Sequence, residues 1–417
     1  MVSYLLLLLL LGLPVAVAGQ NIVTGLFILL SIWMMFHDRA EMREPWCDFL
    51  RHYKVPFSLS ILMVALLSLA TALNPLSPTG IKGALELIPG HFGWLLVPPL
   101  IYILSSRMGP KDWQRVFHWL IGIIVAMAIV AWTQVIWGWR MEDNAIVADV
   151  KRAQVFYSHP LTLAYVALLI FPSGFLRWLR SPRDLWALAL FFASGSLVLT
   201  SGSRTAQAVC LLLVIINVLI KLRGRLRIMV VGLSLALLLG IGLTQNPISR
   251  RFREVITRED TRSDYPDDRL AFWHAHWLMF QEKPILGHGD HLNTAYRKPY
   301  YARLGMVDFI RTYEAHNMFI QIAVNAGLLG LMVFLAWWMW HLRYSWHLTS
   351  RNRDAEIIFQ TMVVWLLASL TQNSFQDSEP RYALTILVAF LYVLGRPGLS
   401  PVAESVLSHG KMLPKVE

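Results

Sequence analysis

Residues 115–138 read RVFHWLIGIIVAMAIVAWTQVIWG, an apolar stretch whose only Lys, Arg, Asp or Glu is its first residue. About 20 apolar residues in a helix cross the roughly 30 Å hydrocarbon core of a bilayer. Similar stretches recur along the 417 residues, of which 56% are hydrophobic and 15% charged, and the mean hydropathy is +0.50. Soluble proteins carry about 25% charged residues. The sequence therefore predicts an all-α polytopic membrane protein, and it excludes a soluble enzyme, a disordered chain, a coiled coil and a disulfide scaffold.

The apolar stretches predict about twelve transmembrane helices and one large outer loop. They lie near residues 3–18, 21–36, 55–73, 91–105, 115–138, 160–179, 184–200, 204–221, 226–244, 315–342, 356–373 and 381–396. The predicted organisation is nine transmembrane helices in 1–244, a periplasmic loop subdomain over 245–314, three transmembrane helices in 315–396 and a cytoplasmic tail over 397–417.

The formal net charge of +11 is interpreted as a topology signal, because Lys and Arg gather in the cytoplasmic loops of membrane proteins. With both termini in the cytoplasm, 20 of the 37 basic residues lie on the cytoplasmic side and six in short outer loops. The other eleven lie in the long outer segment, which the rule discounts because long loops translocate regardless of charge. We therefore expect this orientation and no nucleic-acid partner.

The long outer segment contains one predicted helix. Leu270, Trp273, Trp277 and Phe280 follow the 3-and-4 spacing of an amphipathic helix. Such a helix lies on the membrane surface, with its aromatic face among the lipid headgroups. The run Lys283–Pro284–Ile285–Leu286–Gly287 supplies the Pro and Gly that end a helix.

The first polar cluster is Thr200–Ser201–Gly202–Ser203–Arg204–Thr205–Ala206, in the short turn between the seventh and eighth predicted helices. An arginine there can bind a phosphate through two parallel hydrogen bonds. The alternative is an arginine at a helix end whose guanidinium simply extends to water.

Two further polar clusters lie within the outer segment and at its end. In Asp267–Asp268–Arg269 the aspartates favour the positive end of a helix dipole, which leaves Arg269 unexplained; a metal site at the aspartates is the weaker alternative. In Glu314–Ala315–His316–Asn317 the histidine is either an interfacial residue or a general base with a pKa near neutrality. Gly327 and Gly330, in the following helix, predict close approach of another backbone.

Other polar residues give weaker signals. Arg152 and His159 open the sixth predicted helix and are expected to help bind an anionic ligand. His288, Asp290 and His291 lie in a Gly-rich loop, but a fourth clear metal ligand is missing. The sequence contains no GxSxG, Walker or HExxH motif.

In this order and spacing, the motifs resemble the O-antigen ligase (WaaL) family of bacterial inner-membrane enzymes. The resemblance rests on Ser203–Arg204 at an outer helix start, on Arg269 and the stretch from Trp273 to Lys283–Pro284–Ile285–Leu286–Gly287–His288–Gly289, and on His316–Asn317 followed by Gly327 and Gly330. It covers about residues 150–340, and the twelve-helix layout extends it over the chain. The family implies a fold like that of GT-C membrane glycosyltransferases.

The resemblance implies transfer of O-antigen polysaccharide from undecaprenyl pyrophosphate to a sugar hydroxyl of the lipid A–core oligosaccharide. This reaction takes place at the periplasmic face and completes lipopolysaccharide. No cofactor or metal is implied, and membrane lipids are the remaining partners. Arg204 and Arg269 are predicted to stabilise the departing pyrophosphate, and His316 to act as base in an inverting displacement. The predicted substrate-binding residues are Arg152, His159, Ser203, Asn317 and His288.

Alternatives remain open within and beyond this superfamily. O-antigen polymerases and protein O-oligosaccharyltransferases share the same core pattern. From another class, a lipid-linked oligosaccharide flippase or transporter is expected to place charge near the bilayer midplane and to show internal repeats. Here the polar clusters collect at one predicted face, and the sequence shows no repeat.

Overall fold

The structure is a computed structural model, and the part of the chain that it describes is helical and contains no strand. It describes residues 2–74, 80–138, 152–157, 159–221, 224, 232, 268–290, 292, 294–306, 314–373, 375 and 378–396. In chain order the helices are α1 (Val2–Leu11), α2 (Val17–His37), α3 (Arg39–Leu73), α4 (Gly80–Gly90), α5 (Phe92–Ser105), α6 (Pro110–Trp137), α8 (Pro160–Arg180), α9 (Leu185–Ser201), α10 (Arg204–Lys221), α13 (Asp268–Glu282), α14 (Thr294–Arg303), α15 (Met318–Thr349), α16 (Arg353–Ser369) and α17 (Ser378–Leu394).

Within the described residues, seven helical stretches are long and apolar enough to cross a membrane, which confirms the predicted all-α polytopic membrane protein. They are α2, α3, α4 with α5, α6, α8, α10 and α15. Every predicted span except 226–244 overlaps a described helix. The 226–244 span (apart from Gly232), the loop residues 245–267 and the tail 397–417 lie outside the described residues, so the number twelve stays a prediction.

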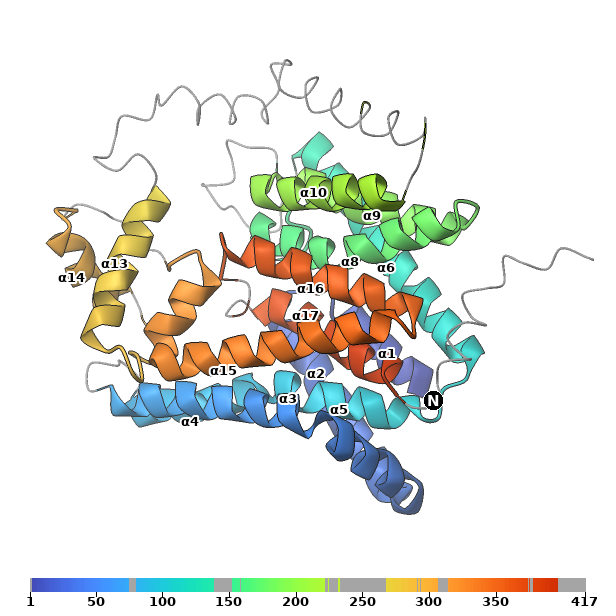
Figure 1. Ribbon diagram of the computed structural model, residues 1–417, viewed down its shortest axis with the longest axis horizontal. Helices are drawn as coiled ribbons and strands as arrows, with labels where there is room; N and C mark the ends of the chain where they lie inside the picture. Colours follow the sequence, from blue (N-terminus) through green and yellow to red (C-terminus); the bar gives the residue numbers. More distant parts are fainter. Residues whose placement is uncertain are drawn as a thin grey trace, which may run out of the picture.

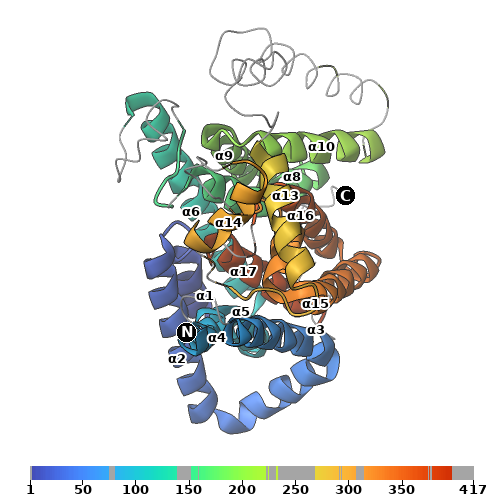
Figure 2. The ribbon, with the colours of Figure 1, turned by 90° about the vertical axis from the view of Figure 1, so that its left-hand side faces the viewer.

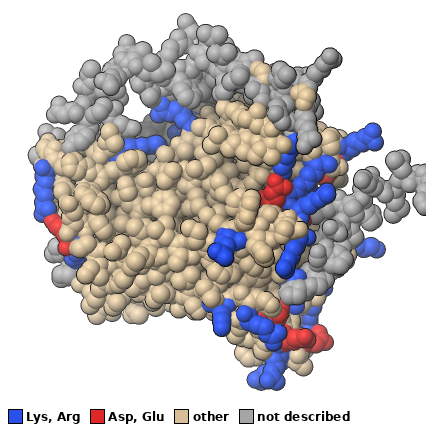
Figure 3. Space-filling view, viewed as in Figure 1, with Lys and Arg blue, Asp and Glu red and all other residues tan. Residues whose placement is uncertain are grey.

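The long helices run mainly along the long axis of the molecule (Figure 1). α13 and α14 cover one end, which faces the viewer in Figure 2 and is called the α13–α14 end below. On the face shown in Figure 3, most Lys and Arg lie toward the opposite end. There Arg180 contacts Asp354 at 3.3 Å and Glu356 at 2.9 Å, and Lys221 contacts Glu356 at 2.5 Å. We call this the paired end.

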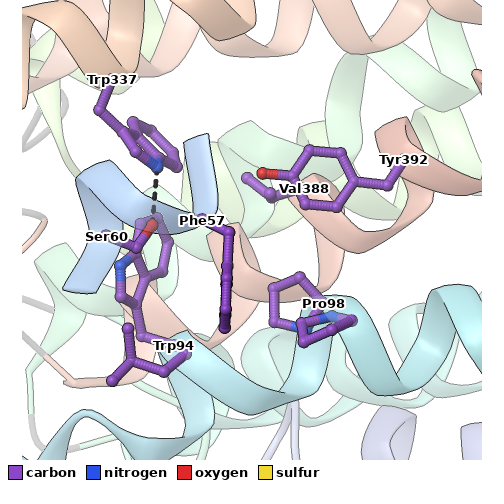
Figure 4. A pocket seen from close by; sticks show the side chains of 9 residues that line it. Phe57, Ser60, Trp94, Pro98, Trp337, Val388 and Tyr392 are labelled. Carbon is purple, nitrogen blue, oxygen red and sulfur yellow. Dashed lines mark hydrogen bonds between the residues drawn. The ribbon is translucent and has the colours of Figure 1, made fainter. Parts of the chain in front are cut away.

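The interior of the bundle is rich in aromatic side chains. Figure 4 shows a small pocket among α3, α5, α15 and α17, lined by Phe57, Trp94 and Trp337 among others. Trp337 Nε1 donates a hydrogen bond to Ser60 Oγ at 3.0 Å, which satisfies a polar group inside the apolar bundle. The residues lining this pocket include none of the predicted site residues.

α15 is broken at Gly327, whose φ of +64° and ψ of −165° are not helical. The carbonyls of Val324 and Asn325, just before the break, accept hydrogen bonds from the backbone N–H groups of His288 and Gly289, both at 2.8 Å. Unsatisfied backbone groups are costly in a membrane, so a helix can break there only where other groups replace the lost bonds. The loop after α13 provides that replacement.

The same loop satisfies the other side of the break. Leu328 and Leu329 donate their backbone N–H groups to the carbonyls of Pro284, at 2.8 Å, and Ile285, at 3.3 Å. A Cβ atom on Gly327 would lie 2.1 Å from the Ile285 oxygen, so only glycine fits. The predicted close approach is confirmed at Gly327. At Gly330 the nearest neighbour is the side chain of Ala326 in the same helix, so that part of the prediction is wrong.

A helix is present where one was predicted in the long segment: α13 ends at Glu282, directly before the predicted stop, whereas its place on the outer side stays a prediction. Leu270 and Trp277 on the predicted aromatic face are about half exposed, at 48% and 52%. The face of α13 that is buried in the protein is made of Ala271, Phe272, Ala275, His276 and Met279. α13 therefore packs on α14 and α15 through small and apolar residues.

Candidate active site

Most of the predicted site residues lie at helix starts, or directly before them, at the α13–α14 end. Thr371, just after α16, donates its hydroxyl hydrogen bond to Thr205 at the start of α10, at 3.0 Å between the Oγ1 atoms. Gln372, the next residue, lies 3.1 Å from Nδ1 of His316. These contacts bring the segments before α10, α15 and α17 to one place.

Residues 152–157 are fastened to this region from both sides. The Arg152 guanidinium donates from Nε to the carbonyl of Ser201 at 2.7 Å, and Ala153 N–H donates to the carbonyl of Thr200 at 2.9 Å. From α6, the side chain of Gln134 bonds both the N–H and the carbonyl of Val155, at 2.8 and 2.9 Å. Val155 has a φ of +55°, which is unfavourable for a β-branched residue, and the Gln134 amide holds it there.

The turn between α9 and α10 places Arg204 at the first position of α10, with its side chain exposed. Gly202, with φ of +65°, ends α9, and Arg152 Nε would lie 3.0 Å from a Cβ atom there. Ser203 is buried, and its hydroxyl accepts a hydrogen bond from Ala206 N–H at 3.4 Å, as a helix-capping serine does. Arg152 and the Ser203–Arg204 turn are therefore neighbours.

His316 lies directly before α15 with a φ of +46°, a conformation that is uncommon outside glycine. Asn317 starts the helix by accepting hydrogen bonds from the N–H groups of Phe319 and Ile320, at 3.0 and 3.2 Å. Unfavourable backbone conformations occur often at active sites, where the surroundings hold them. Here the Asn317 cap and the Gln372 contact hold the imidazole in place.

Burial and the neighbouring groups together determine the protonation state of His316. Burial is the largest effect and lowers its pKa below the ordinary 6.5. The contact with Gln372 and the charge of Glu314 raise the pKa, whereas Arg269 and Arg297 lower it. The net result is a lowered pKa, so His316 is neutral at physiological pH. A neutral imidazole is the form that can accept a proton.

His159 belongs to the same group of residues. Burial, which is the largest cause, together with the nearby Arg152 and His316 lowers its pKa to about 4. Because these electrostatic effects are local, they place Arg152, His159 and His316 in one neighbourhood and Arg269 beside it. The structure therefore brings together five of the predicted site residues: Arg152, His159, Arg269, His316 and, through the Thr205–Thr371 contact, Arg204.

Polar side chains support this group from behind. Glu314 contacts Arg297 at 3.7 Å and accepts a hydrogen bond from Asn373 Nδ2 at 2.6 Å. Gln321, on the first turn of α15, accepts from Ala315 N–H at 2.9 Å and donates to Asn325 at 2.9 Å. Buried polar networks of this kind fix a local structure when their members are satisfied.

His288 is placed apart from this group. Its side chain is buried, with Nδ1 2.6 Å from the Tyr296 hydroxyl and Nε2 2.6 Å from the Met279 carbonyl. Both ring nitrogens are thus used within the α13–α14 pair. Its contribution to substrate binding, like that of Ser203 and Asn317, stays a prediction.

Sequence reasoning missed three residues of the site: Gln134, Glu314 as an ion-pair partner, and Gln372. The polar run Thr371–Gln372–Asn373 at the end of an apolar helix was a usable signal, because such residues are costly in a bilayer. Among the described residues, no group of three or more His, Cys, Asp and Glu could hold a metal ion. Asp267 and His291 lie outside the described residues.

Comparison with known proteins adds one finding. Residues 188–335 match the protein family described as O-Antigen ligase. The match runs from α9 to the middle of α15, and it includes Arg204, Arg269 and His316. No curated protein matches the chain. Residues 188–335 therefore match the O-antigen ligase family, which supports membership of the O-antigen ligase and polymerase superfamily.

Proposed function

We propose that the protein is an O-antigen ligase, which transfers O-antigen polysaccharide from undecaprenyl pyrophosphate to a sugar hydroxyl of lipid A–core. One observation carries the proposal beyond the superfamily: the partly buried His316, whose pKa is lowered, contacts Gln372 and lies within electrostatic reach of Arg269 and His159. A neutral base beside cationic groups suits a reaction in which a hydroxyl attacks a sugar and pyrophosphate is the leaving group.

In the proposed step, the acceptor hydroxyl oxygen forms a bond to the anomeric carbon of the donor sugar. The bond from that carbon to the pyrophosphate oxygen breaks, and its electron pair leaves with undecaprenyl pyrophosphate. The hydroxyl proton moves to His316. Because no enzyme nucleophile takes part, the anomeric configuration is inverted. A product that retains the donor configuration would contradict this mechanism.

Arg204 and Arg269 supply positive charge where the pyrophosphate gains negative charge. A guanidinium can donate two parallel hydrogen bonds to phosphate oxygens, and it stays charged at every physiological pH. Since pyrophosphate is already a good leaving group, we propose that these arginines suffice and that the transfer needs no metal. Arg152 and His159 complete the anion site.

The distribution of charge supports a periplasmic site in the inner membrane. On the face shown in Figure 3, most Lys and Arg lie toward the paired end, as expected for the cytoplasmic side of a membrane protein. The α13–α14 end would then face the periplasm, where lipid-linked O-antigen and lipid A–core meet. The exposed Leu270 and Trp277 of α13 suit contact with lipid headgroups.

Reconstitution tests the proposal. Purified protein is mixed with undecaprenyl-pyrophosphate-linked O-antigen and lipid A–core in EDTA, and His316→Ala is compared with His347→Ala, an exposed histidine at the other end of α15. We expect glycan on lipid A–core with wild type and His347→Ala but not with His316→Ala. Growth of glycan on the undecaprenyl carrier would instead identify a polymerase, and glycan on protein a protein O-oligosaccharyltransferase. No transfer, under conditions where a known ligase works, would favour a flippase or other transporter.

A further inference from the structure

The contact between His316 and Gln372 determines which nitrogen of the imidazole carries the proton. We propose that Gln372 is a positioning residue that keeps the proton of neutral His316 on Nδ1, so that Nε2 carries the lone pair and acts as the base. This inference rests on the proposed function for the identity of the proton donor, but the protonation pattern itself can be measured without any substrate.

The hydrogen-bond chemistry leaves one assignment. Oε1 of Gln372 lies 3.1 Å from Nδ1 of His316, and an amide oxygen can only accept a hydrogen bond. Nδ1 must therefore carry the proton. In a neutral imidazole the other nitrogen then has no proton, and the hydrogen bond made by one nitrogen selects the state of the other.

The neighbours of Gln372 hold it in this position from both sides. Thr371 bonds the Thr205 hydroxyl at 3.0 Å and the Ala368 carbonyl at 3.1 Å. Asn373, which is buried, donates to Glu314 at 2.6 Å and to Gln321 at 3.3 Å. Gln372 thus lies between two anchored residues, one tied to α10 and one to the segment that carries His316. A group that orients a base needs such support.

His159 has the opposite proton assignment, which the backbone fixes. Its Nδ1 accepts a hydrogen bond from the backbone N–H of Leu161 at 3.1 Å, and a backbone N–H can only donate. The proton of neutral His159 is therefore on Nε2. The two histidines thus differ in role: His316 can accept a proton through Nε2, and His159 can donate a hydrogen bond through Nε2, for example to a phosphate oxygen.

The charged groups that face His316 come from each neighbouring element. Glu314 lies in its own segment, and Arg269 and His276 lie on α13. Arg297 lies on α14, and His159 lies before α8. Apart from Glu314 these groups are cationic or neutral. A carboxylate placed at position 372 would therefore stabilise the protonated imidazole strongly, which makes this position a sensitive test.

Two variants move the pH dependence in opposite directions. The base must be neutral, so activity is lost as the pH falls through the pKa of His316. Gln372→Glu raises that pKa and should move the acidic limb of the kcat/KM profile to higher pH. Gln372→Met removes a contact that raises the pKa, so the limb should move to lower pH while the maximal rate falls about tenfold. If both variants lower the rate but leave the limb in place, Gln372 is merely structural and the proposal is overturned.

A second measurement separates this inference from the proposed function. In protein labelled with ¹⁵N-histidine, the signal that disappears in His316→Gln identifies His316 by NMR. We expect protonated Nδ1 and unprotonated Nε2 in wild type, and a shift toward Nε2–H in Gln372→Met. A wild-type signal with the proton on Nε2 would overturn the proposal even if transfer occurs. The expected pattern in protein without ligase activity would support the Gln372 contact and refute only the function.

Discussion

Arginines at the two ends of the bundle have different partners. At the paired end Arg180 bonds two carboxylates, Asp354 and Glu356, and Lys221 shares the second. At the α13–α14 end Arg152 donates to a backbone carbonyl, and the charges of Arg152 and Arg269 lower the pKa of neighbouring histidines. A carboxylate neutralises an arginine and ties helices together. The contrast concerns Arg180 and Arg152, because Arg297 and Arg303 at the α13–α14 end also pair with carboxylates, Glu314 and Glu282.

The largest expected effect is at the base. His316→Asn should lower transfer by about 100- to 10,000-fold, the contribution typical of a general base, and should leave the melting temperature within a few degrees. Single-turnover assays with lipid-linked donor and lipid A–core measure the loss, and His347→Asn is the control. A loss below tenfold would show that another group takes the proton.

The next prediction tests whether the site needs the paired hydrogen-bond donors of arginine or only its positive charge. Arg204→Lys and Arg269→Lys each keep the charge but lose the paired donors, so activity should fall about 10- to 100-fold. The same change at Arg343, exposed near the paired end of α15, should cost less than twofold. Equal losses at all three positions would remove the distinction between the two ends.

The break in α15 predicts a large effect on folding. Gly327→Ala puts a Cβ atom 2.1 Å from the Ile285 carbonyl oxygen and forces alanine to a φ of +64°, which costs at least about 1–3 kcal/mol of unfolding free energy. The yield of folded protein in size-exclusion chromatography measures it. Gly122→Ala, in the middle of α6 with open space around it, is the matched control and should be neutral or stabilising.

At the paired end the expected effect is on stability rather than rate. Arg180→Met leaves Asp354 and Glu356 without their shared guanidinium and should lower the unfolding free energy by about 1–3 kcal/mol. Thermal unfolding in detergent tests this, with the exposed Arg183→Met as control. The activity per folded molecule should stay within twofold. A tenfold loss of rate would mean that the paired end also acts on the reaction.

The smallest expected effect is a change in the pH dependence of activity, which tests the charges around His316 at the α13–α14 end. The pKa of His316 is lowered below the ordinary 6.5, so the midpoint of the acidic limb of wild-type activity should lie below pH 6.5. Glu314 raises that pKa, so Glu314→Gln should move the acidic limb to lower pH. Movement to higher pH would contradict the assigned charges.

Sequence patterns were sufficient where chemistry and spacing are local. The apolar stretches, α13 and its end at Glu282, and the close approach at Gly327 follow from residue order alone. Gln372 and Gln134 did not, because their partners lie 56 and 21 residues away and a single sequence contains no record of such contacts. The opposite face of α13 was not predicted: Ala271 and Ala275 are fully buried there, and a residue pattern alone did not show which helices they pack against.

The break in α15 also sets an order of assembly. Residues 284–289, whose backbone groups replace the missing helix bonds, are synthesised before Met318–Thr349. They are in turn attached to the end of α3, where Asn74 donates to the His288 carbonyl at 2.6 Å and Thr71 accepts from Asp290 N–H at 2.9 Å. The receiving surface for the broken helix can therefore be complete before that helix leaves the ribosome, so insertion of α15 depends on residues already made.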